Sequence, residues 1–289
     1  MNGNLFATLS EHISEFSKGH RRIADFILAH YDKAAFMTAS KLGESVGVSE
    51  STVVRFASEL GFDGYPELQK ALQEEMRTRL TSVQRIEVSF DRFGRDEVFK
   101  SVLLHDIDRI RSTLEETNPS DFSAAVENIV NANRIYVMGI RSSAALASFL
   151  GYYFRLMLPN VTVIQTGSRS ELYEQLMHMT DEDVLIGISF PRYSRQTVHA
   201  INYSHDIGAK SIAITDCEES PIASKASLSL YAKSDMVSFV DSLVAPLSLI
   251  NALIVAVSIQ NKELVSKNFA MLERIWEEYE VYEKNGGEK

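Results

Sequence analysis

The sequence predicts an N-terminal all-α helix-turn-helix domain followed by an α/β domain built on a doubly wound parallel sheet. Over residues 1–80, apolar residues recur three or four positions apart and no strand pattern interrupts them. From residue 96 onward, short apolar runs alternate with longer helical ones. That alternation is typical of parallel strands whose connecting helices cover both faces of a sheet. A chain of 289 residues is long enough for one small and one medium domain, each with its own core.

The helical pattern and its interruption give the domain boundaries. We place the helix-turn-helix domain at residues 1–80, a linker at residues 81–95 and the α/β domain at residues 96–289, because residues 82–95 show neither clear periodicity nor a dense apolar face. Helices are expected at Leu5–Phe16, Gly19–Tyr31, Ala39–Val46, Glu50–Leu60, Pro66–Leu80, from Asp96 to about Thr117, and at Lys262–Glu283. Strands are expected at Ile135–Met138, Val161–Gln165, Val184–Ser189, Ser211–Thr215 and Leu228–Ala232.

Composition excludes several classes of protein. The net charge of −10 argues against a protein that coats polyanions generally, because non-specific affinity for nucleic acid comes from Lys and Arg. A sequence-specific DNA-binding protein remains possible, although residues 1–80 hold 9 Lys and Arg against 11 Asp and Glu. The histidines show no paired ligand spacing, so no metal is expected.

The single cysteine and the first residues of the chain indicate a cytoplasmic protein. Cys217 has no partner for an intramolecular disulfide, and the segment Met1–Asn4 does not begin a signal peptide. The most apolar stretch runs from Ser242 to Ile259 but contains Pro246 and several serines. It is therefore interpreted as a buried core helix, and no membrane contact is expected.

Residues 38–62 fit two short helices joined by a tight turn. Thr38 is placed to cap a first helix that ends at Gly47, and Ser49 is placed to cap a second that ends near Gly61. In the second helix, Val53, Phe56, Ala57 and Leu60 fall on one face, which we expect to pack on the domain.

The opposite face of the second helix carries hydroxyls and one arginine. A helix N-terminus favours a phosphate and arginine commonly reads guanine, so this face suits the major groove of DNA. The alternative is a helical hairpin with an ordinary solvated face. The residues expected to contact DNA are Ser49, Glu50, Ser51, Thr52, Arg55 and Ser58.

This segment resembles the MurR/RpiR family of bacterial transcription regulators. Val48-Ser-Glu-Ser-Thr-Val-Val-Arg-Phe56, followed by Leu60-Gly-Phe-Asp-Gly-Tyr-Pro-Glu-Leu68, is similar to that family's recognition helix and the turn after it. The resemblance implies a helix-turn-helix domain joined to a sugar-isomerase (SIS) domain, and a role in regulating carbohydrate metabolism.

Two loops at strand ends of the second domain are candidate anion sites. After the first strand, Gly139 permits a tight turn, and Ser142 and Ser143 offer hydroxyls beside the free N–H groups of a helix start. Arg141 stands where a GxGxxG motif needs its second glycine, so a nicotinamide cofactor is not expected, nor is any other cofactor.

The second loop follows the third strand. Ser189 ends that strand, and the next residues provide a cation and hydroxyl donors that suit a phosphate or a carboxylate. An ordinary polar loop before a helix is the alternative interpretation. The further candidate residues are Arg192, Tyr193, Ser194 and Thr197.

The resemblance to SIS domains assigns a sugar-phosphate site to these loops. Ser143 matches the family's serine in the first loop, and Ser189 matches the start of its Ser-x-Ser-Gly-x-Thr loop. Pro191 and Arg192 stand where the second serine and the glycine are expected, and Ser194 replaces the threonine. The resemblance therefore implies a sugar phosphate or a related acidic sugar as effector.

Catalysis by an aldose–ketose isomerase needs a positioned base. The candidates are Glu171, Glu174, His178 and His199, and each is better explained as a helix-surface residue because no second catalytic group pairs with it. We therefore expect a non-enzymatic regulator that acts as a homodimer or homotetramer. An SIS-type isomerase with a helical appendage and a pure dimerisation module are the alternatives.

Overall fold

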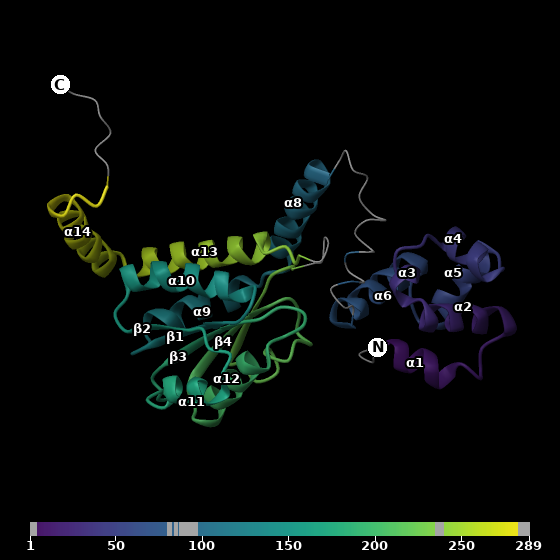
Figure 1. The fold of residues 1–289 in the computed structure, drawn as a ribbon, viewed down its shortest axis with the longest axis horizontal. Coiled ribbons are helices and arrows are strands. Elements are labelled where there is room, and N and C mark those ends of the chain that lie inside the picture. Colours follow the sequence, from purple (N-terminus) through teal and green to yellow (C-terminus); the bar gives the residue numbers. More distant parts are fainter. Residues whose placement is uncertain (1–4, 80–82, 84–85, 87–97, 235–239, 283–289) are drawn as a thin grey trace, which may run out of the picture. The chain divides into compact units, whose positions relative to one another are not determined.

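The computed structural model describes residues 5–79, 83, 86, 98–234 and 240–282 (Figure 1). These residues divide into two compact units, one containing the N-terminal helices and one containing the sheet. The predicted linker at 81–95 lies outside the described residues apart from Val83 and Ile86.

The first unit is helical, as the apolar periodicity predicts. Its core contains fully buried Leu9, Ile23, Phe56 and Leu68. The first helix ends at His12, earlier than predicted, and Ser17 caps the next one by accepting a hydrogen bond from the backbone N–H of His20. The helices are α1 (Leu5–His12), α2 (Lys18–Ala29), α3 (Tyr31–Ala34), α4 (Ala39–Val46), α5 (Glu50–Glu59) and α6 (Tyr65–Arg79).

The second unit alternates strands and helices after two leading helices, α8 (Val98–Glu116) and α9 (Pro119–Val130). The strands are β1 (Ile135–Gly139), β2 (Val161–Ile164), β3 (Val184–Ile188), β4 (Lys210–Thr215) and β5 (Leu228–Tyr231). The helices that follow are α10 (Ser143–Met157), α11 (Arg169–Leu176), α12 (Arg195–Asp206), α13 (Val244–Gln260) and α14 (Lys262–Glu278). Each predicted strand is present to within a residue or two of its expected bounds.

The strands form one parallel sheet in the order β2-β1-β3-β4-β5. Helices α9, α10 and α13 cover one face, and α11 and α12 cover the other (Figure 1). The predicted doubly wound α/β fold is therefore confirmed. The strand order reverses between β1 and β3, whose residues Gly139 and Ile188 are register partners. Ligands of such sheets bind at the carboxyl ends of the strands that flank this reversal.

Helix α13 contains the most apolar stretch of the chain and lies in the core, as predicted. Ala245, Ile250, Leu253 and Val257 are fully buried in it. No single helix among the described residues is long and apolar enough to cross a membrane. Helices α13 and α14 pass that test only as a pair, and they are bent by 99° at their junction.

Candidate functional site

Helices α4 and α5 form the predicted helix-turn-helix. The Thr38 hydroxyl accepts a hydrogen bond from the N–H of Lys41 at 3.2 Å, and Ser49 caps α5 by accepting from the N–H of Thr52 at 3.3 Å. Between them Gly47 adopts a left-handed conformation with φ of 69°, which a glycine adopts without steric cost. The capping residues read from the sequence therefore build this turn.

A second glycine, absent from the predicted set of site residues, lets the two helices approach closely. A Cβ atom at Gly43 would lie 2.8 Å from the carbonyl oxygen of Val48. No side chain fits there unless the turn moves. The signal available in the sequence was a glycine inside a helix, where its low helix propensity calls for a packing reason.

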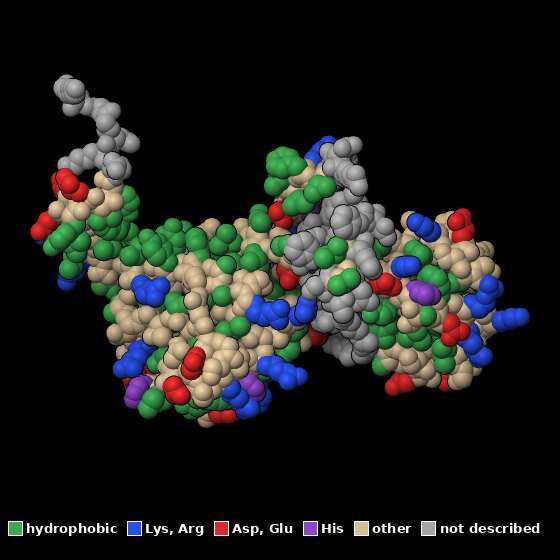
Figure 2. Space-filling view, viewed as in Figure 1, with side chains coloured by type: hydrophobic (Ala, Val, Ile, Leu, Met, Phe, Trp, Pro, Cys, Tyr) green, Lys and Arg blue, Asp and Glu red, His purple; other side chains and the backbone are tan. Residues whose placement is uncertain are grey.

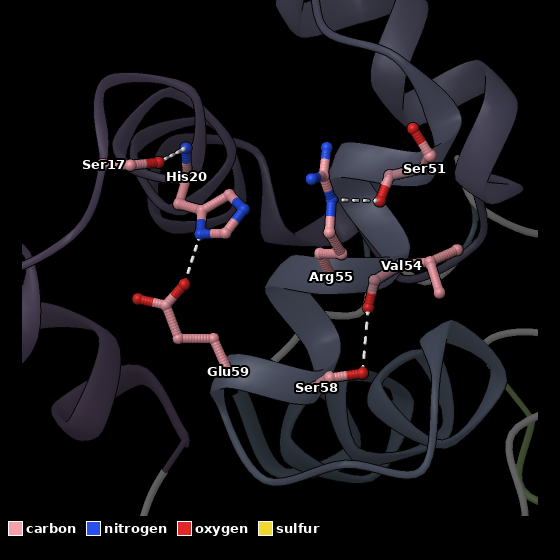
Figure 3. A network of polar contacts seen from close by, with 7 residues as sticks. All are labelled: Ser17, His20, Ser51, Val54, Arg55, Ser58 and Glu59. Atoms are coloured by element: carbon pink, nitrogen blue, oxygen red, sulfur yellow. Dashed lines mark hydrogen bonds and ion pairs between the residues drawn. The ribbon is translucent and has the colours of Figure 1, made fainter.

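The outer face of α5 carries mainly polar side chains, as predicted, with the exposed Val54 among them (Figure 3). Ser51, Arg55 and Ser58 are exposed, whereas the opposite-face residues Val53 and Phe56 are fully buried. Of the remaining predicted contact residues, Ser49 and Glu50 are exposed and Thr52 is half-buried. The structure thus places the whole predicted set around the N-terminal half and one side of α5.

Local hydrogen bonds order these side chains. The Ser49 hydroxyl lies 2.9 Å from that of Ser51 and 2.8 Å from that of Thr52. Arg55 donates through Nε to the carbonyl of Ser51 at 3.3 Å, and the Ser58 hydroxyl donates to the carbonyl of Val54 at 3.4 Å (Figure 3). The arginine contact uses Nε, so the two terminal nitrogens take no part in it.

Helix α2 contacts the last residue of α5 and the turn that precedes α5. His20 Nδ1 pairs with Glu59 Oε2 near the end of α5 (Figure 3). Arg22 Nη1 donates to the carbonyl of Gly47 at 3.2 Å, in the turn that precedes α5. Sequence patterns did not indicate either contact, because the partners are 39 and 25 residues apart.

The β1–α10 loop is one of the two candidate anion loops. A Cβ atom at Gly139 would lie 2.4 Å from the Ser143 carbonyl oxygen, so only glycine allows the helix to start this close to the strand. Ser142 is exposed at the start of α10, and Ser143 is buried. Arg141, between them and the strand, has a φ of 59°. Non-glycine residues adopt this conformation at a cost of about 1–2 kcal/mol.

The β3–α12 loop is the other candidate. The buried Ser189 hydroxyl accepts a hydrogen bond from the N–H of Ser194 at 3.0 Å, and Ser194 caps α12 by accepting from the N–H of Thr197 at 3.5 Å. Arg192 is exposed, with φ of 66°, at the position where the resemblance expects glycine. The Thr197 side chain is fully buried, and its hydroxyl has no hydrogen-bond partner among the described residues.

Tyr193 points to the end of β4. Its hydroxyl donates to Asp216 Oδ1 at 2.8 Å and lies 3.9 Å from the sulfur of Cys217. Burial, and then the charge of Asp216, raise the pKa of Tyr193 well above its usual range. Burial is also the main cause that raises the pKa of the Cys217 thiol to about 11, with Asp216 second. The phenol is thus neutral, and its hydroxyl donates to Asp216.

The candidate bases lie on or beside α11 and α12. Glu171 accepts a hydrogen bond from the hydroxyl of Thr166, and Glu174 and His178 are exposed. His199 is half-buried on α12. In the part of the chain that the structure describes, no cluster of histidine, cysteine and acidic side chains is arranged to hold a metal ion.

Comparison with known proteins identifies a domain family for each of the two parts of the chain. Residues 3–79 match the helix-turn-helix domain of the rpiR family, and residues 128–256 match the SIS domain. The sugar isomerase domain of an RpiR transcription factor from Sphaerobacter thermophilus is 31% identical, with a TM-score of 0.60. That similarity covers 62% of this chain and 99% of the other. The chain belongs to the RpiR family of transcriptional regulators.

Two further relatives extend over both domains. A helix-turn-helix-type transcriptional regulator of Haemophilus influenzae is 27% identical over 224 residues, which are 76% of this chain and 76% of that protein. The Vibrio vulnificus NanR protein complexed with ManNAc-6P is 20% identical and covers 94% of this RpiR-family chain and 98% of its own, with a TM-score of 0.54. The latter similarity shows a shared fold. The chain is thus a transcriptional regulator with a helix-turn-helix and an SIS domain.

Proposed function

We propose that this regulator binds a specific DNA operator through α5 and that a sugar phosphate or related acidic sugar, bound in its SIS domain, alters that affinity. The observation that carries the proposal is that two donor-rich loops follow the neighbouring parallel strands β1 and β3, whose last residues Gly139 and Ile188 are register partners. Ser142 and Ser143 come from one loop, and Ser189, Arg192 and Ser194 come from the other. An anion is the ligand that helix N-termini, hydroxyls and arginine favour together.

The DNA-binding half of the proposal rests on α5. Its buried face fixes the helix on its unit, and its outer face presents Ser51, Thr52 and Arg55. Arginine and hydroxyl side chains on a recognition helix read base edges in the major groove. Because the chain is acidic overall, we expect selectivity to come from these few contacts rather than from general attraction to phosphates.

The carbohydrate ligand is proposed from relatives and from the loops. The similar NanR protein is described in complex with ManNAc-6P, a phosphorylated sugar, and the Sphaerobacter relative has a sugar isomerase domain. In this chain, Arg192 introduces a cation where the family motif has glycine. A cation at this position suits a ligand with more negative charge than a neutral sugar carries.

The regulator is proposed to act as a homodimer or homotetramer. Large apolar side chains are exposed on neighbouring helices of the second unit, and Figure 2 shows hydrophobic side chains gathered along α13 and α14. A contiguous apolar surface of this kind is typical of a protein–protein interface. The exposed residues on these helices include Val255, Ile259, Leu264, Met271, Ile275 and Tyr279.

Binding without conversion is the expected chemistry. The SIS-type isomerase remains the second candidate, since Glu171, in the first turn of α11, is hydrogen-bonded to Thr166, two residues after the end of β2. Proton transfer needs a base within reach of the substrate, and none of the candidate bases pairs with a second catalytic group that would support isomerisation.

The test is a thermal-shift screen of the full chain against sugar phosphates and sugar acids, followed by operator-binding measurements with and without each ligand that binds. A ligand that binds only the folded protein raises the melting temperature. Ser143→Ala combined with Arg192→Ala should abolish the ligand effect on DNA affinity while leaving binding by the unliganded protein unchanged. Turnover of a bound sugar phosphate by the wild type would favour the isomerase instead.

A further inference from the structure

Helix α8, by which the chain enters the second unit, is held to that unit by polar contacts. The N–H of Lys233 donates to the Thr113 hydroxyl at 2.9 Å, and Lys233 Nζ pairs with Glu116 Oε2 at 2.5 Å. The Ser242 hydroxyl donates to Asp106 Oδ1 at 2.6 Å. Over the described range 98–116, Thr113 is the one buried residue of α8, whereas large apolar residues of that helix, Phe99, Leu104, Ile107 and Leu114 among them, are exposed. Contacts of this kind hold a helix less firmly than an apolar core does.

The partners of α8 follow β5, so they lie at the same edge of the sheet as the candidate ligand loops. Lys233 comes two residues after the end of β5. The N–H of its neighbour Ala232 donates to the carbonyl of Thr215 at 2.8 Å, and Thr215 and Tyr231 are register partners in β4 and β5. The ends of β4 and β5 are therefore fixed to each other immediately before the contact with α8.

Thr215 in turn adjoins the contact made by the ligand loop. Its hydroxyl donates to Asp216 Oδ1 at 3.2 Å, and the same oxygen accepts the hydroxyl of Tyr193. Thr215 is fully buried and Asp216 is 3% exposed. In such surroundings a displaced donor leaves a carboxylate poorly solvated, which makes the arrangement sensitive to the position of the donor.

We propose that these contacts form the link by which the ligand loop acts on α8. The link runs from Tyr193 through Asp216 and Thr215 to Ala232, and then from Lys233 to Thr113. This link rests on the proposed function, because it needs an effector that binds in the SIS domain. It assigns Tyr193 to transmission of the signal rather than to binding of the effector. A ligand that repositions the β3–α12 loop changes the Tyr193–Asp216 contact, and the ends of β4 and β5 pass that change to α8.

Amide hydrogen exchange of the unliganded full chain tests the link without any knowledge of the effector. Tyr193→Phe removes only the hydroxyl that reaches Asp216. We expect exchange of the α8 amides at residues 103–116 to become at least threefold faster, while α10 exchanges as in the wild type. Tyr203→Phe is the matched control, since it removes a phenol hydroxyl from α12, where the ring packs against Tyr173, and it should leave α8 unchanged.

A second pair of variants separates a link from general destabilisation. Thr113→Val should accelerate α8 exchange as Tyr193→Phe does, and Thr113→Ser, which keeps the hydroxyl, should restore wild-type rates. The Tyr193→Phe, Thr113→Val double variant should exchange no faster than the faster single variant, because both changes break one chain of contacts. Unchanged α8 exchange in Tyr193→Phe, or multiplied effects in the double variant, would overturn the link. A failed proposed function would show separately, as the absence of ligand or operator binding.

Discussion

His20 Nδ1 pairs with Oε2 of Glu59, and this contact joins α2 to the last residue of the recognition helix. The His20 ring also packs edge-on against Phe56, with ring centroids 5.5 Å apart. Phe56 is fully buried on the inner face of α5. The pair therefore lies at the end of α5 beside the core, and Arg22 contacts the turn before the other end of this helix.

Glu59→Gln is expected to lower the free energy of unfolding by no more than about 1 kcal/mol, because partly exposed ion pairs contribute little. The Glu59 side chain is 43% exposed. Chemical denaturation at constant pH measures the effect, and Glu11→Gln on the surface of α1 is the control. A loss above about 2 kcal/mol would contradict this expectation, because a loss of that size is typical of breaking a buried hydrogen-bond network.

Arg55→Ala and Thr52→Ala should weaken operator binding and leave the fold intact. Loss of a base contact costs about 1–3 kcal/mol, which is a fall in affinity of roughly 5- to 150-fold. Binding is measured at one fixed salt concentration. Lys70→Ala on α6 removes a cation from the same unit and is the control for charge. If Arg55→Ala binds the operator as tightly as Lys70→Ala does, α5 is not the reading helix.

Local signals predicted the helix-turn-helix well because its turns are made by residues close in sequence. Thr38 and Ser49 each cap the helix that follows by accepting a hydrogen bond from the N–H group three residues later. Gly47 ends α4 in the left-handed conformation that glycine favours. The central strands β1, β3 and β4 were equally readable, since strands buried on both faces consist of short continuous apolar runs. The residues of the two candidate anion loops could be named for a similar reason: they follow those runs directly.

Contacts between distant residues were not predictable from these signals. Tyr193 reaches Asp216 across 23 positions, and its role depends on the adjacency of β3 and β4, which periodicity does not specify. The sequence also does not indicate which hydroxyls of the two candidate loops are buried and which are exposed. Ser143, Ser189 and Thr197 are buried, whereas Ser142 is exposed.

Gly43→Ala should destabilise the helix-turn-helix. The new methyl group would lie 2.8 Å from the backbone oxygen of Val48, which cannot rotate away, so a cost of about 1–3 kcal/mol is expected from overpacking. Gly167→Ala is the matched control, because no atom of the described residues lies within 4 Å of the position its Cβ would take, and its backbone angle is not left-handed. Thermal unfolding of the two variants should differ, and equal melting temperatures would contradict the close approach of α4 and the turn.

Cys217 should react slowly with alkylating reagents in the folded protein. Burial and the Asp216 charge raise the pKa of its thiol to about 11, so the reactive thiolate is scarce at pH 8. Relative to a thiol with the ordinary value of 9.0, the thiolate fraction falls roughly 100-fold. The rate of iodoacetamide labelling should rise about tenfold per pH unit up to the pKa. Asp216→Asn should lower the pKa and accelerate labelling at pH 8, and an unchanged rate would remove Asp216 as a cause.

The apolar stripe on α14 should mediate self-association. Leu264, Met271 and Ile275 lie seven and four residues apart, so they share one face of α14, and Tyr279, the residue after the helix end, follows at the same spacing. No residue in the described range of α14 is buried within its own unit. Exposure of such a face in a monomer is unfavourable because each large apolar side chain contributes about 1.5–3 kcal/mol when it is buried. A second copy of the chain would cover the stripe.

Met271→Lys places a charge in the middle of this stripe, where a partner helix would have to bury it. We expect light scattering at micromolar concentration to show a homodimer or homotetramer for the wild type and dissociated species for Met271→Lys. Ser266→Lys adds the same charge to an exposed position of α14 away from the stripe, and it should assemble as the wild type does. Operator affinity should fall with assembly in Met271→Lys, because two half-sites bound by one dimer are held together by the protein contact. A wild-type chain that stays monomeric with and without DNA would contradict the interface.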